Sequence, residues 1–204
     1  MVSALPVRTL YIARHGAADA LGTLLDEGRV QCELLAHRLR RVPLDAIWHS
    51  PLPRARDSAA IIAATFPRAL LDEASELVDH VPHVPKVADR SSEWAGFFDG
   101  YSEHEAAADA AVAHRLTRRF ARPPRPGQRS THELLVTHAY PVGWLVREAL
   151  EAPPRAWLSL ARIANTGLTI IEYVEGEPAA VVCVNDRSHL VTAADADPSH
   201  TAPP

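Results

Sequence analysis

Short apolar segments alternate with longer and more polar segments over the first 150 residues of the chain. Strands are predicted for four short apolar or β-prone segments: residues 9–13, 45–48, 68–72 and 133–137. Helices are predicted for four longer segments: about residues 28–41, 51–66, 101–122 and 141–150. Strands that alternate with helices in this way are typical of an α/β fold with a mostly parallel sheet.

Local signals refine these boundaries. Asp26 is placed to cap the first helix, and Ser50 followed by Pro51 predicts an N-cap and a first helical residue for the second helix. After residue 150 the pattern changes to apolar segments without intervening helices. Three more strands, added at an edge of the sheet, are predicted there: residues 158–164, 168–174 and 179–184.

Residues 73–100 interrupt the alternation. Prolines, glycines, aromatic and charged residues are mixed there without a period, so we expect a lid-like excursion from one domain that spans residues 1–191. Its aromatic side chains are expected to pack on the core and to face a pocket in part: Trp94, Phe97, Phe98 and Tyr101. Residues 192–204 are small and polar, which predicts a disordered tail.

The composition narrows the class of protein. Of 204 residues, 47% are hydrophobic and 23% charged, which suits one folded domain, and the net charge of −4 argues against a nucleic-acid partner. Cys32 and Cys183, in the absence of a CxxC motif, exclude a disulfide framework and a thiolate zinc site, although one bridge or two free thiols both remain open. Because no apolar run reaches the length of a membrane span and residues 1–8 lack a leader pattern, we expect a cytoplasmic protein without a membrane partner.

Polar residues follow three of the predicted strands at the point where each strand ends. Arg14 and His15 follow the first strand, Arg54 comes soon after the second, and His138 follows the strand at 133–137. In parallel sheets the carboxyl ends of the strands border one ligand crevice, so these side chains are expected to meet there. Two guanidiniums can bind a phosphoryl group bidentately, and a neutral imidazole is a nucleophile toward phosphorus. The set therefore indicates phosphoryl chemistry.

Two further features fit that chemistry. Gly16 is expected to leave room for a ligand to approach the backbone closely. A helix that begins near Tyr140 and Pro141 would direct its free N–H groups at the same anion.

The segments that carry these residues resemble the motifs of the histidine phosphatase superfamily, the phosphoglycerate mutase-like proteins. The similarity covers about residues 8–190, and its motifs occur in the family's order at residues 14–16, 25–31, 50–55, 134–138 and 185–190. Segments 77–82, 151–158 and 164–169 are similar to the branch that includes the mitochondrial serine/threonine protein phosphatase. The resemblance implies a three-layer phosphoglycerate mutase-like fold, in which helices flank a mostly parallel central sheet.

The resemblance also implies roles for individual residues. His15 would attack phosphorus and become a phosphohistidine, while the phosphoryl oxygens would be held by Arg14, Arg54 and His138. Gly16 and the backbone of Ala139 would line the pocket. The family's general acid is usually a glutamate in an L-x-E setting. Here Leu77-Val78-Asp79 matches that setting with an aspartate, so Asp79 is the preferred acid and Glu76 the alternative.

The preferred function is a metal-independent phosphomonoester hydrolase without a cofactor, which acts on a phosphorylated small molecule or a phosphoprotein. Two alternatives remain: a phosphoglycerate mutase-type phosphoryl transfer, and a phosphoryl-binding module without turnover. His80 and His83 have a spacing that fits some metal sites, but no further ligand cluster is evident beside them, and exposed loop histidines are the preferred interpretation. The sequence does not predict the physiological substrate or the oligomeric state.

Overall fold

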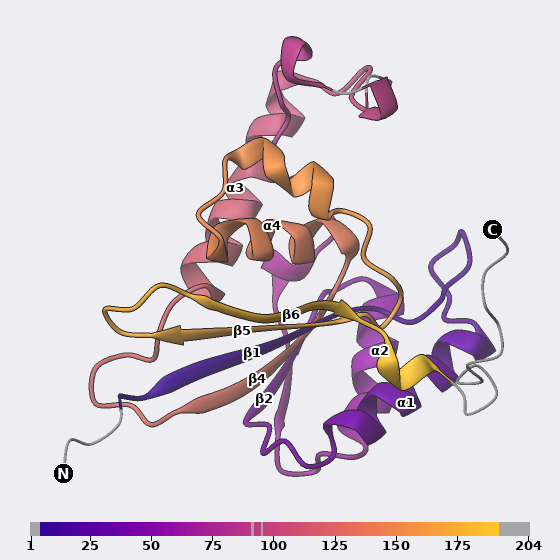
Figure 1. Cartoon of the computed structure of the whole chain (residues 1–204). Coiled ribbons are helices and arrows are strands. Elements are labelled where there is room, and N and C mark those ends of the chain that lie inside the picture. The colour runs from indigo at the N-terminus through magenta and orange to yellow at the C-terminus, as the bar shows by residue number, and fades with distance from the viewer. Residues whose placement is uncertain (1–4, 91, 95, 192–204) are drawn as a thin grey trace, which may run out of the picture.

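Six strands form one mixed sheet in the computed structural model, which describes residues 5–90, 92–94 and 96–191 (Figure 1). The strands are β1 (Val7–Arg14), β2 (Ala46–His49), β3 (Leu70–Glu73), β4 (Thr131–Thr137), β5 (Leu168–Val174) and β6 (Ala180–Asp186). Their order across the sheet is β3-β2-β4-β1-β5-β6. The first four run parallel, β5 is antiparallel to β1, and β6 is antiparallel to β5. The predicted α/β class and the mostly parallel sheet are confirmed.

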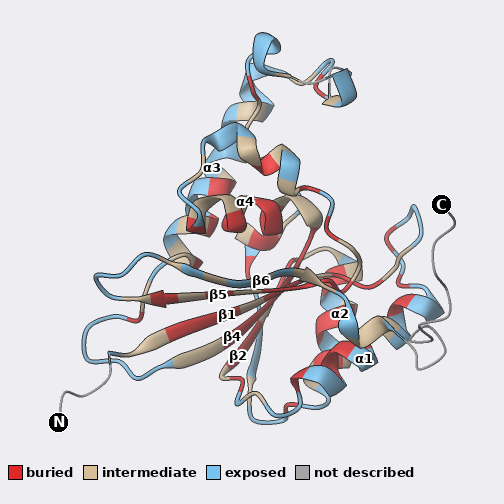
Figure 2. Cartoon of the chain, viewed as in Figure 1, coloured by how far each residue is buried: buried red, intermediate tan, exposed pale blue. Residues whose placement is uncertain are grey.

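Helices cover both faces of this sheet. The described elements include α1 (Asp26–Leu39) and α2 (Pro53–Ala63) on one face, and α3 (Glu103–Phe120) and α4 (Ala139–Ala149) on the other (Figure 1). Each face has its own apolar core, because alternate strand residues point to opposite sides. Leu35 and Ile62 pack on one side of the sheet, and Leu116 and Val142 on the other. Buried residues accordingly concentrate on the central strands β1, β2, β4 and β5 and on the sheet-facing sides of the helices, whereas the edge strands β3 and β6 have none (Figure 2).

One buried ion pair crosses from β1 to β4. Arg8 Nε and Nη2 each donate to a carboxylate oxygen of Glu133 at 2.8 Å, in the bidentate geometry that guanidinium and carboxylate favour. Both side chains are nearly buried, and Trp48 Nε1 donates a further hydrogen bond of 3.0 Å to the same carboxylate. This network lies near the amino-terminal ends of β1 and β4, away from the carboxyl ends of the strands.

One expected strand and two expected helix starts are wrong. Residues 158–164 do not form a strand, because Pro154–Leu160 is a 3-10 helix, η4, which the chain enters through two consecutive prolines and which buries Trp157 completely. Asp26 is the first helical residue rather than the cap, and α2 begins at Pro53 rather than Pro51. A short apolar run does not by itself distinguish a strand from a helical turn.

The excursion at 73–100 is folded against the rest of the domain. It contains three short 3-10 helices, η1 (Ser75–Leu77), η2 (Val87–Asp89) and η3 (Ser92–Trp94), and it stands beside and beyond α3 in Figure 1. Phe98 and Trp94 pack with Trp157 of η4, and the Trp157 indole donates a 2.8 Å hydrogen bond to the carbonyl of His83. The expected packing is thus observed for Trp94, Phe98 and Tyr101, whereas Phe97 is exposed. The predicted tail at 192–204 lies outside the described residues.

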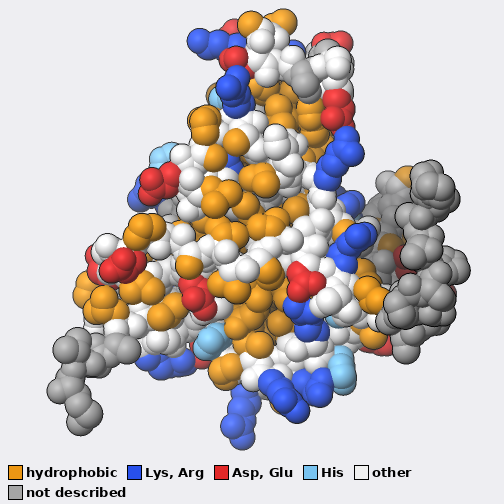
Figure 3. All heavy atoms as spheres, in the orientation of Figure 1, with side chains coloured by type: hydrophobic (Ala, Val, Ile, Leu, Met, Phe, Trp, Pro, Cys, Tyr) orange, Lys and Arg blue, Asp and Glu red, His pale blue; other side chains and the backbone are white. Residues whose placement is uncertain are grey.

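The surface carries charges of both signs. On the face drawn in Figure 3, arginines and acidic side chains are interspersed rather than separated, which agrees with the small net charge of −4. Among the described residues, none of the helices combines the length and apolar character that crossing a bilayer requires.

Candidate active site

A pocket of about 470 Å³ opens at the carboxyl ends of β1, β2 and β4. Strand pairing explains how it forms. The parallel register places Arg14 opposite Thr137 and His49 opposite Val136, so the residues that follow each strand emerge side by side. The lining side chains come from the ends of β1 and β4, the loop after β1, the start of α2, the start of α4, the turn after η1 and the end of η4. They are Arg14, His15, Ala18, Asp19, Ala20, Arg54, Asp79, His138, Ala139, Tyr140 and Ala161.

Backbone hydrogen bonds fix the end of β1 within this pocket. The N–H of His15 donates to the carbonyl of Thr137 at 2.9 Å, and the side-chain amide of Asn165 donates to the carbonyl of His15 at 2.9 Å. The N–H of Thr166 donates to the carbonyl of Arg14, also at 2.9 Å. The two chemically important residues therefore sit on backbone that is held from both neighbouring strands.

The ring of His15 has a defined tautomer. Its Nδ1 lies 2.7 Å from the carbonyl oxygen of Gly16, and since a carbonyl only accepts, Nδ1 must carry the proton. The lone pair of Nε2 then faces the pocket, where Arg54 Nε donates to it at 3.0 Å. Burial, together with the charges of Arg14 and Arg54, lowers the pKa of His15 to about 4. At neutral pH the ring is a neutral base with its free nitrogen in the pocket.

Two arginines line the pocket with that nitrogen. Arg14 Nη1 donates to the carbonyl of Ile163 at 2.8 Å, which fixes the guanidinium at the pocket wall. Arg54 lies in the first turn of α2 and donates through Nε to His15 and through Nη2 to Asp79, at 3.2 Å. A phosphoryl group that displaced these internal partners of Arg54 would find two guanidiniums at the pocket wall.

His138 occupies the N-cap position of α4, directly after β4. Its ring centroid is 5.1 Å from that of His15, and its Nε2 lies 2.8 Å from the hydroxyl oxygen of Ser50. Ser50 Oγ also accepts a hydrogen bond from the N–H of Leu52, and its own proton can be donated to His138 Nε2. In that tautomer Nδ1 carries the ring proton, lies 3.8 Å from Asp79 Oδ2 and has no hydrogen-bond partner among the described residues. Burial and the nearby His15, Arg54 and Arg14 lower the pKa of His138 to about 2, so the ring is neutral.

Asp79 brings a carboxylate into the same space. Its Oδ2 lies 3.2 Å from Arg54 Nη2 and 3.8 Å from His138 Nδ1. Because His138 is neutral, the second contact is not an ion pair. Partial burial raises the pKa of the Asp79 carboxyl, although Arg54, His80 and Arg14 oppose that shift. A carboxyl whose pKa is raised is better suited to donate a proton.

Glu76, the alternative acid, lies elsewhere. Its Oε2 accepts a 2.9 Å hydrogen bond from Arg119 Nη1 on α3, and it does not line the pocket. Of the two carboxylates considered from the sequence, the structure brings only Asp79 to the histidines.

Gly16 has a different role from the one expected. A Cβ atom there would lie 2.4 Å from the carbonyl oxygen of Gly28, and one on Gly28 would lie 2.1 Å from that of Ala17. The two glycines thus allow the loop after β1 to pack on the start of α1. The Gly16 N–H donates to Ser58 Oγ, and its carbonyl accepts from His15, so its backbone groups are occupied within the protein. The prediction that it gives a ligand access to the backbone is wrong, whereas Ala139 does line the pocket.

A comparison with protein families decides which group the chain belongs to. The model of the histidine phosphatase superfamily (branch 1) matches residues 10–186. The chain belongs to that superfamily. The matched range contains each of the pocket residues discussed above.

Curated relatives of this superfamily member share about a quarter of its residues. The mitochondrial serine/threonine-protein phosphatase Pgam5 of Caenorhabditis briggsae is 27% identical over 188 residues, which are 90% of this chain and 64% of that protein. The human protein of the same name is 28% identical over 162 residues, or 76% of this chain and 54% of its own length. This chain therefore spans less than two thirds of the relatives it matches.

Solved structures share the fold. Mycobacterial hydrolase 1 superposes with a TM-score of 0.68 at 21% identity, covering 88% of this chain and 99% of that one. A phosphoglycerate mutase from Plasmodium falciparum superposes with a TM-score of 0.60 at 19% identity, covering 86% of this chain and 89% of that one. At this level of identity the likeness establishes the architecture, and it confirms the expected phosphoglycerate mutase-like arrangement of three layers.

Several residues of this superfamily member's pocket were not expected from the sequence. Tyr140 lines the pocket beside Ala139, and Ser50 orients His138 instead of capping α2. The loop after β1 also contributes a wall, because Asp19 Oδ1 accepts hydrogen bonds from the backbone of Leu21 and Thr23 and folds the loop back. The position of Tyr140 two residues after His138 was an available signal, whereas the loop wall depends on tertiary packing.

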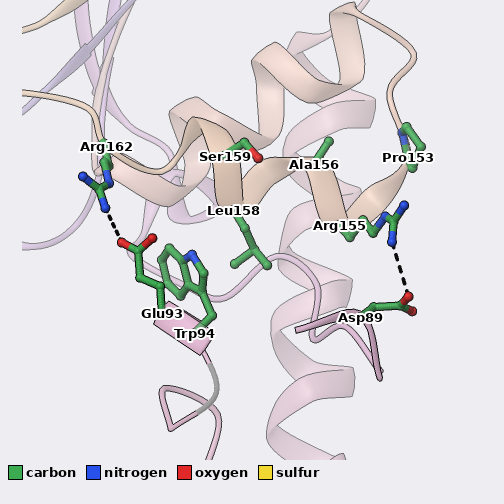
Figure 4. A pocket seen from close by; sticks show the side chains of 9 residues that line it. All are labelled: Asp89, Glu93, Trp94, Pro153, Arg155, Ala156, Leu158, Ser159 and Arg162. Carbon is green, nitrogen blue, oxygen red and sulfur yellow. Dashed lines mark hydrogen bonds and ion pairs between the residues drawn. The ribbon is translucent and has the colours of Figure 1, made fainter. Parts of the chain in front are cut away.

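A second pocket, of about 590 Å³, lies between η4 and the excursion (Figure 4). Two exposed ion pairs bridge it, Arg155 with Asp89 and Arg162 with Glu93, and Trp94 lies between them. Exposed pairs of this kind contribute little to stability. The second pocket lacks the combination of nucleophile, acid and anion-binding groups that the first contains.

The histidine pair at 80 and 83 does not gather a ligand set. Among the described residues no group of three or more histidine, cysteine, aspartate or glutamate side chains is arranged to hold a metal ion. His80 is buried, contrary to the expected exposed loop position, and its Nδ1 donates to the carbonyl of Val78 at 2.7 Å. That contact belongs to the turn that carries Asp79.

Proposed function

We propose that this chain is a phosphomonoester hydrolase that works without a metal ion, through a phosphohistidine on Nε2 of His15. The observation that carries the proposal is the state of that nitrogen. It is unprotonated, it faces the pocket, and the guanidiniums of Arg14 and Arg54 lie around it with the carboxyl of Asp79 nearby. These are a nucleophile, an anion-binding pair and a proton donor in one place.

The bound phosphoryl group accepts hydrogen bonds from three side chains of the pocket. Arg54 exchanges its bond to His15 for the phosphoryl oxygens, and Arg14 binds from the wall. The Nδ1–H of His138, which has no hydrogen-bond partner within the part of the chain that the structure describes, donates to a third phosphoryl oxygen. Because His138 also begins α4, the free N–H groups of that helix add to the positive potential.

The first chemical step transfers the phosphoryl group to the enzyme. The lone pair of His15 Nε2 forms a bond to phosphorus while the bond from phosphorus to the ester oxygen breaks. The departing oxygen takes the proton of the Asp79 carboxyl and leaves as an alcohol. The arginines and His138 stabilise the charge that spreads over the equatorial oxygens.

The second step restores the enzyme. Asp79, now a carboxylate, accepts a proton from a water molecule as that water attacks phosphorus, and the bond from phosphorus to Nε2 breaks. Inorganic phosphate leaves, and Asp79 is protonated again for the next cycle. The bond between Nδ1–H and the Gly16 carbonyl holds the ring orientation through both steps.

Two observations favour hydrolysis over the alternatives. The described lining contains two arginines and no lysine, and both arginines lie at the nucleophile, so a mutase's second phosphate would lack a cation of its own. A binding module without turnover needs no acid, whereas Asp79 lies within 3.8 Å of His138. The substrate is a phosphorylated small molecule or a phosphoprotein, and the names of the Pgam5 relatives favour the phosphoprotein.

The test is hydrolysis of p-nitrophenyl phosphate in EDTA, with the wild type beside His15→Ala. We expect turnover that survives EDTA and falls to background in the variant. His104→Ala, an exposed histidine on α3, is the matched control and should keep wild-type activity. Loss of activity in EDTA, or activity that is indifferent to His15, would overturn the proposal.

A further inference from the structure

The turn that carries Asp79 must be placed more accurately than a glutamate-bearing turn would need. An aspartate side chain is one methylene shorter and has fewer torsions with which to correct an error of the backbone. The carboxylate nevertheless reaches Arg54 Nη2 at 3.2 Å and His138 Nδ1 at 3.8 Å. A displacement of about 1 Å is enough to lose such an alignment.

We propose that His80 and Asp109 are positioning residues that hold this turn, so that the shorter acid reaches the leaving group. The inference rests on the proposed function, because it concerns the proton donor of that reaction. Neither side chain lines the pocket, and both act through the backbone on either side of Asp79.

His80 forms a hydrogen bond that joins the two sides of the turn around Asp79. Its Nδ1–H donates to the carbonyl of Val78 at 2.7 Å, so the residues before and after Asp79 are joined by one hydrogen bond. The ring is only 5% exposed, and its buried Nε2 has no hydrogen-bond partner among residues 5–90, 92–94 and 96–191. A buried polar atom without a partner costs free energy, so packing alone would favour an apolar residue here. The Nδ1 bond gives a reason for histidine at this position.

Asp109 holds the far side of the turn. From α3, its Oδ2 accepts a 2.8 Å hydrogen bond from the N–H of Val81 and another from the hydroxyl of Tyr101. Val81 and Tyr101 stand at the two ends of the outer part of the excursion. The carboxylate of Asp109 therefore ties both ends of the outer part of the excursion, Val81 and Tyr101, to α3. The turn at Asp79 is thereby held to a long helix.

The near side of the turn is anchored by β4. The hydroxyl of Thr137 donates to the carbonyl of Leu77 at 2.6 Å, and the side chain of Leu77 is fully buried. Thr137 directly precedes His138, so this anchor also ties the turn to one of the phosphate-binding residues. Because β4 fixes the backbone before Asp79, the position of Asp79 then depends on the backbone after it, which His80 and Asp109 hold.

The test compares two leaving groups in the full-length protein. p-Nitrophenolate is a stable anion and needs little help from an acid, whereas the alkoxide from ethyl phosphate needs a proton. The rate compared is that of the first turnover, the release of the alcohol or phenol as the enzyme is phosphorylated, because the later hydrolysis step needs Asp79 as a base for either ester. For His80→Leu and Asp109→Ala we expect the first-turnover rate on ethyl phosphate to fall about 10-fold or more, with the p-nitrophenyl first-turnover rate within about 3-fold. Asp79→Asn should give the same contrast with a larger loss.

Conservative variants separate positioning from stability. His80→Asn keeps an N–H donor and Asp109→Asn keeps an acceptor oxygen, so both should recover much of the alkyl rate. Asp89→Asn, which removes an ion pair of the excursion away from the turn, is the control and should change neither rate. Equal losses on both esters, or no loss on either, would overturn the inference. A wild type without turnover would contradict the proposed function and this inference together, whereas failure of the inference alone leaves the Asp79→Asn pattern intact.

Discussion

Replacement of His15 with asparagine should make the folded protein less sensitive to acid. The asparagine side chain can still donate a hydrogen bond to the Gly16 carbonyl, so the loop after β1 keeps its anchor. What the variant loses is a group that resists protonation in the folded state. In the wild type the pKa of His15 is lowered from 6.5 to about 4, chiefly by burial.

The size of the effect follows from proton linkage. Between pH 6.5 and 4 the unfolded chain binds a proton at His15 that the folded chain does not, so stability is lost as the pH falls through that window. Above pH 6.5 the ring is neutral in both states and the dependence vanishes. With these two pKa values, the loss between pH 7 and pH 5 is about 2 kcal/mol.

Urea denaturation at pH 7 and at pH 5 measures this difference. The free energy of unfolding of the wild type should fall more steeply than that of His15→Asn, by about 2 kcal/mol between the two pH values. Equal changes in the two proteins would show that His15 titrates normally in the folded state. His15 would then be protonated below about pH 6.5, and the nucleophile would not stay neutral in acid as its burial predicts.

Three further outcomes are expected. Asp79→Asn should lower kcat on alkyl phosphates by roughly 10²–10⁴-fold, whereas Glu76→Gln should stay near wild type in the same steady-state assay, and the reverse order would transfer the acid role. Gly16→Ala should destabilise the fold by about 1–3 kcal/mol in urea denaturation, because its Cβ would lie 2.4 Å from the backbone of α1; an unchanged midpoint would contradict the close packing. Glu133→Gln should lower the free energy of unfolding by about 3–5 kcal/mol, because Arg8 is then buried without its counter-charge. The kcat of the folded protein should not change. A smaller loss of stability would mean that water reaches the ion pair.

The location of the pocket could be predicted because it depends on the parallel arrangement of the strands rather than on individual side-chain contacts. Buried parallel strands are recognisable by their apolar runs, and their carboxyl ends must lie at one edge of the sheet. His15, Arg54 and His138 each come at or soon after such an end, so their meeting followed from the topology. Asp79 was placed by resemblance alone, and its position beside His138 then depends on the bond from Thr137 to the turn.

Other features depend on contacts between segments that are distant in the sequence. Gly16 looked like a ligand position because only the packing of Gly28 against the same loop reveals its role. Ser50 looked like a helix cap because its partner, His138, is 88 residues away. The segment at 158–164 has the apolar content of a strand, but the burial of Trp157 against the excursion favours a helical turn. In each case tertiary packing overrode a local signal.

Trapping the phosphoenzyme tests the central claim most directly. Asp79→Asn should be mixed with p-nitrophenyl phosphate and quenched rapidly, because the aryl ester still phosphorylates the enzyme while the step that needs a base is slowed. The account predicts an acid-labile phosphoryl group on His15, attached at Nε2, and none when His15→Asn is added to the same variant. A phosphoryl group on another residue, or turnover by the wild type without any trapped intermediate in the variant, would contradict it.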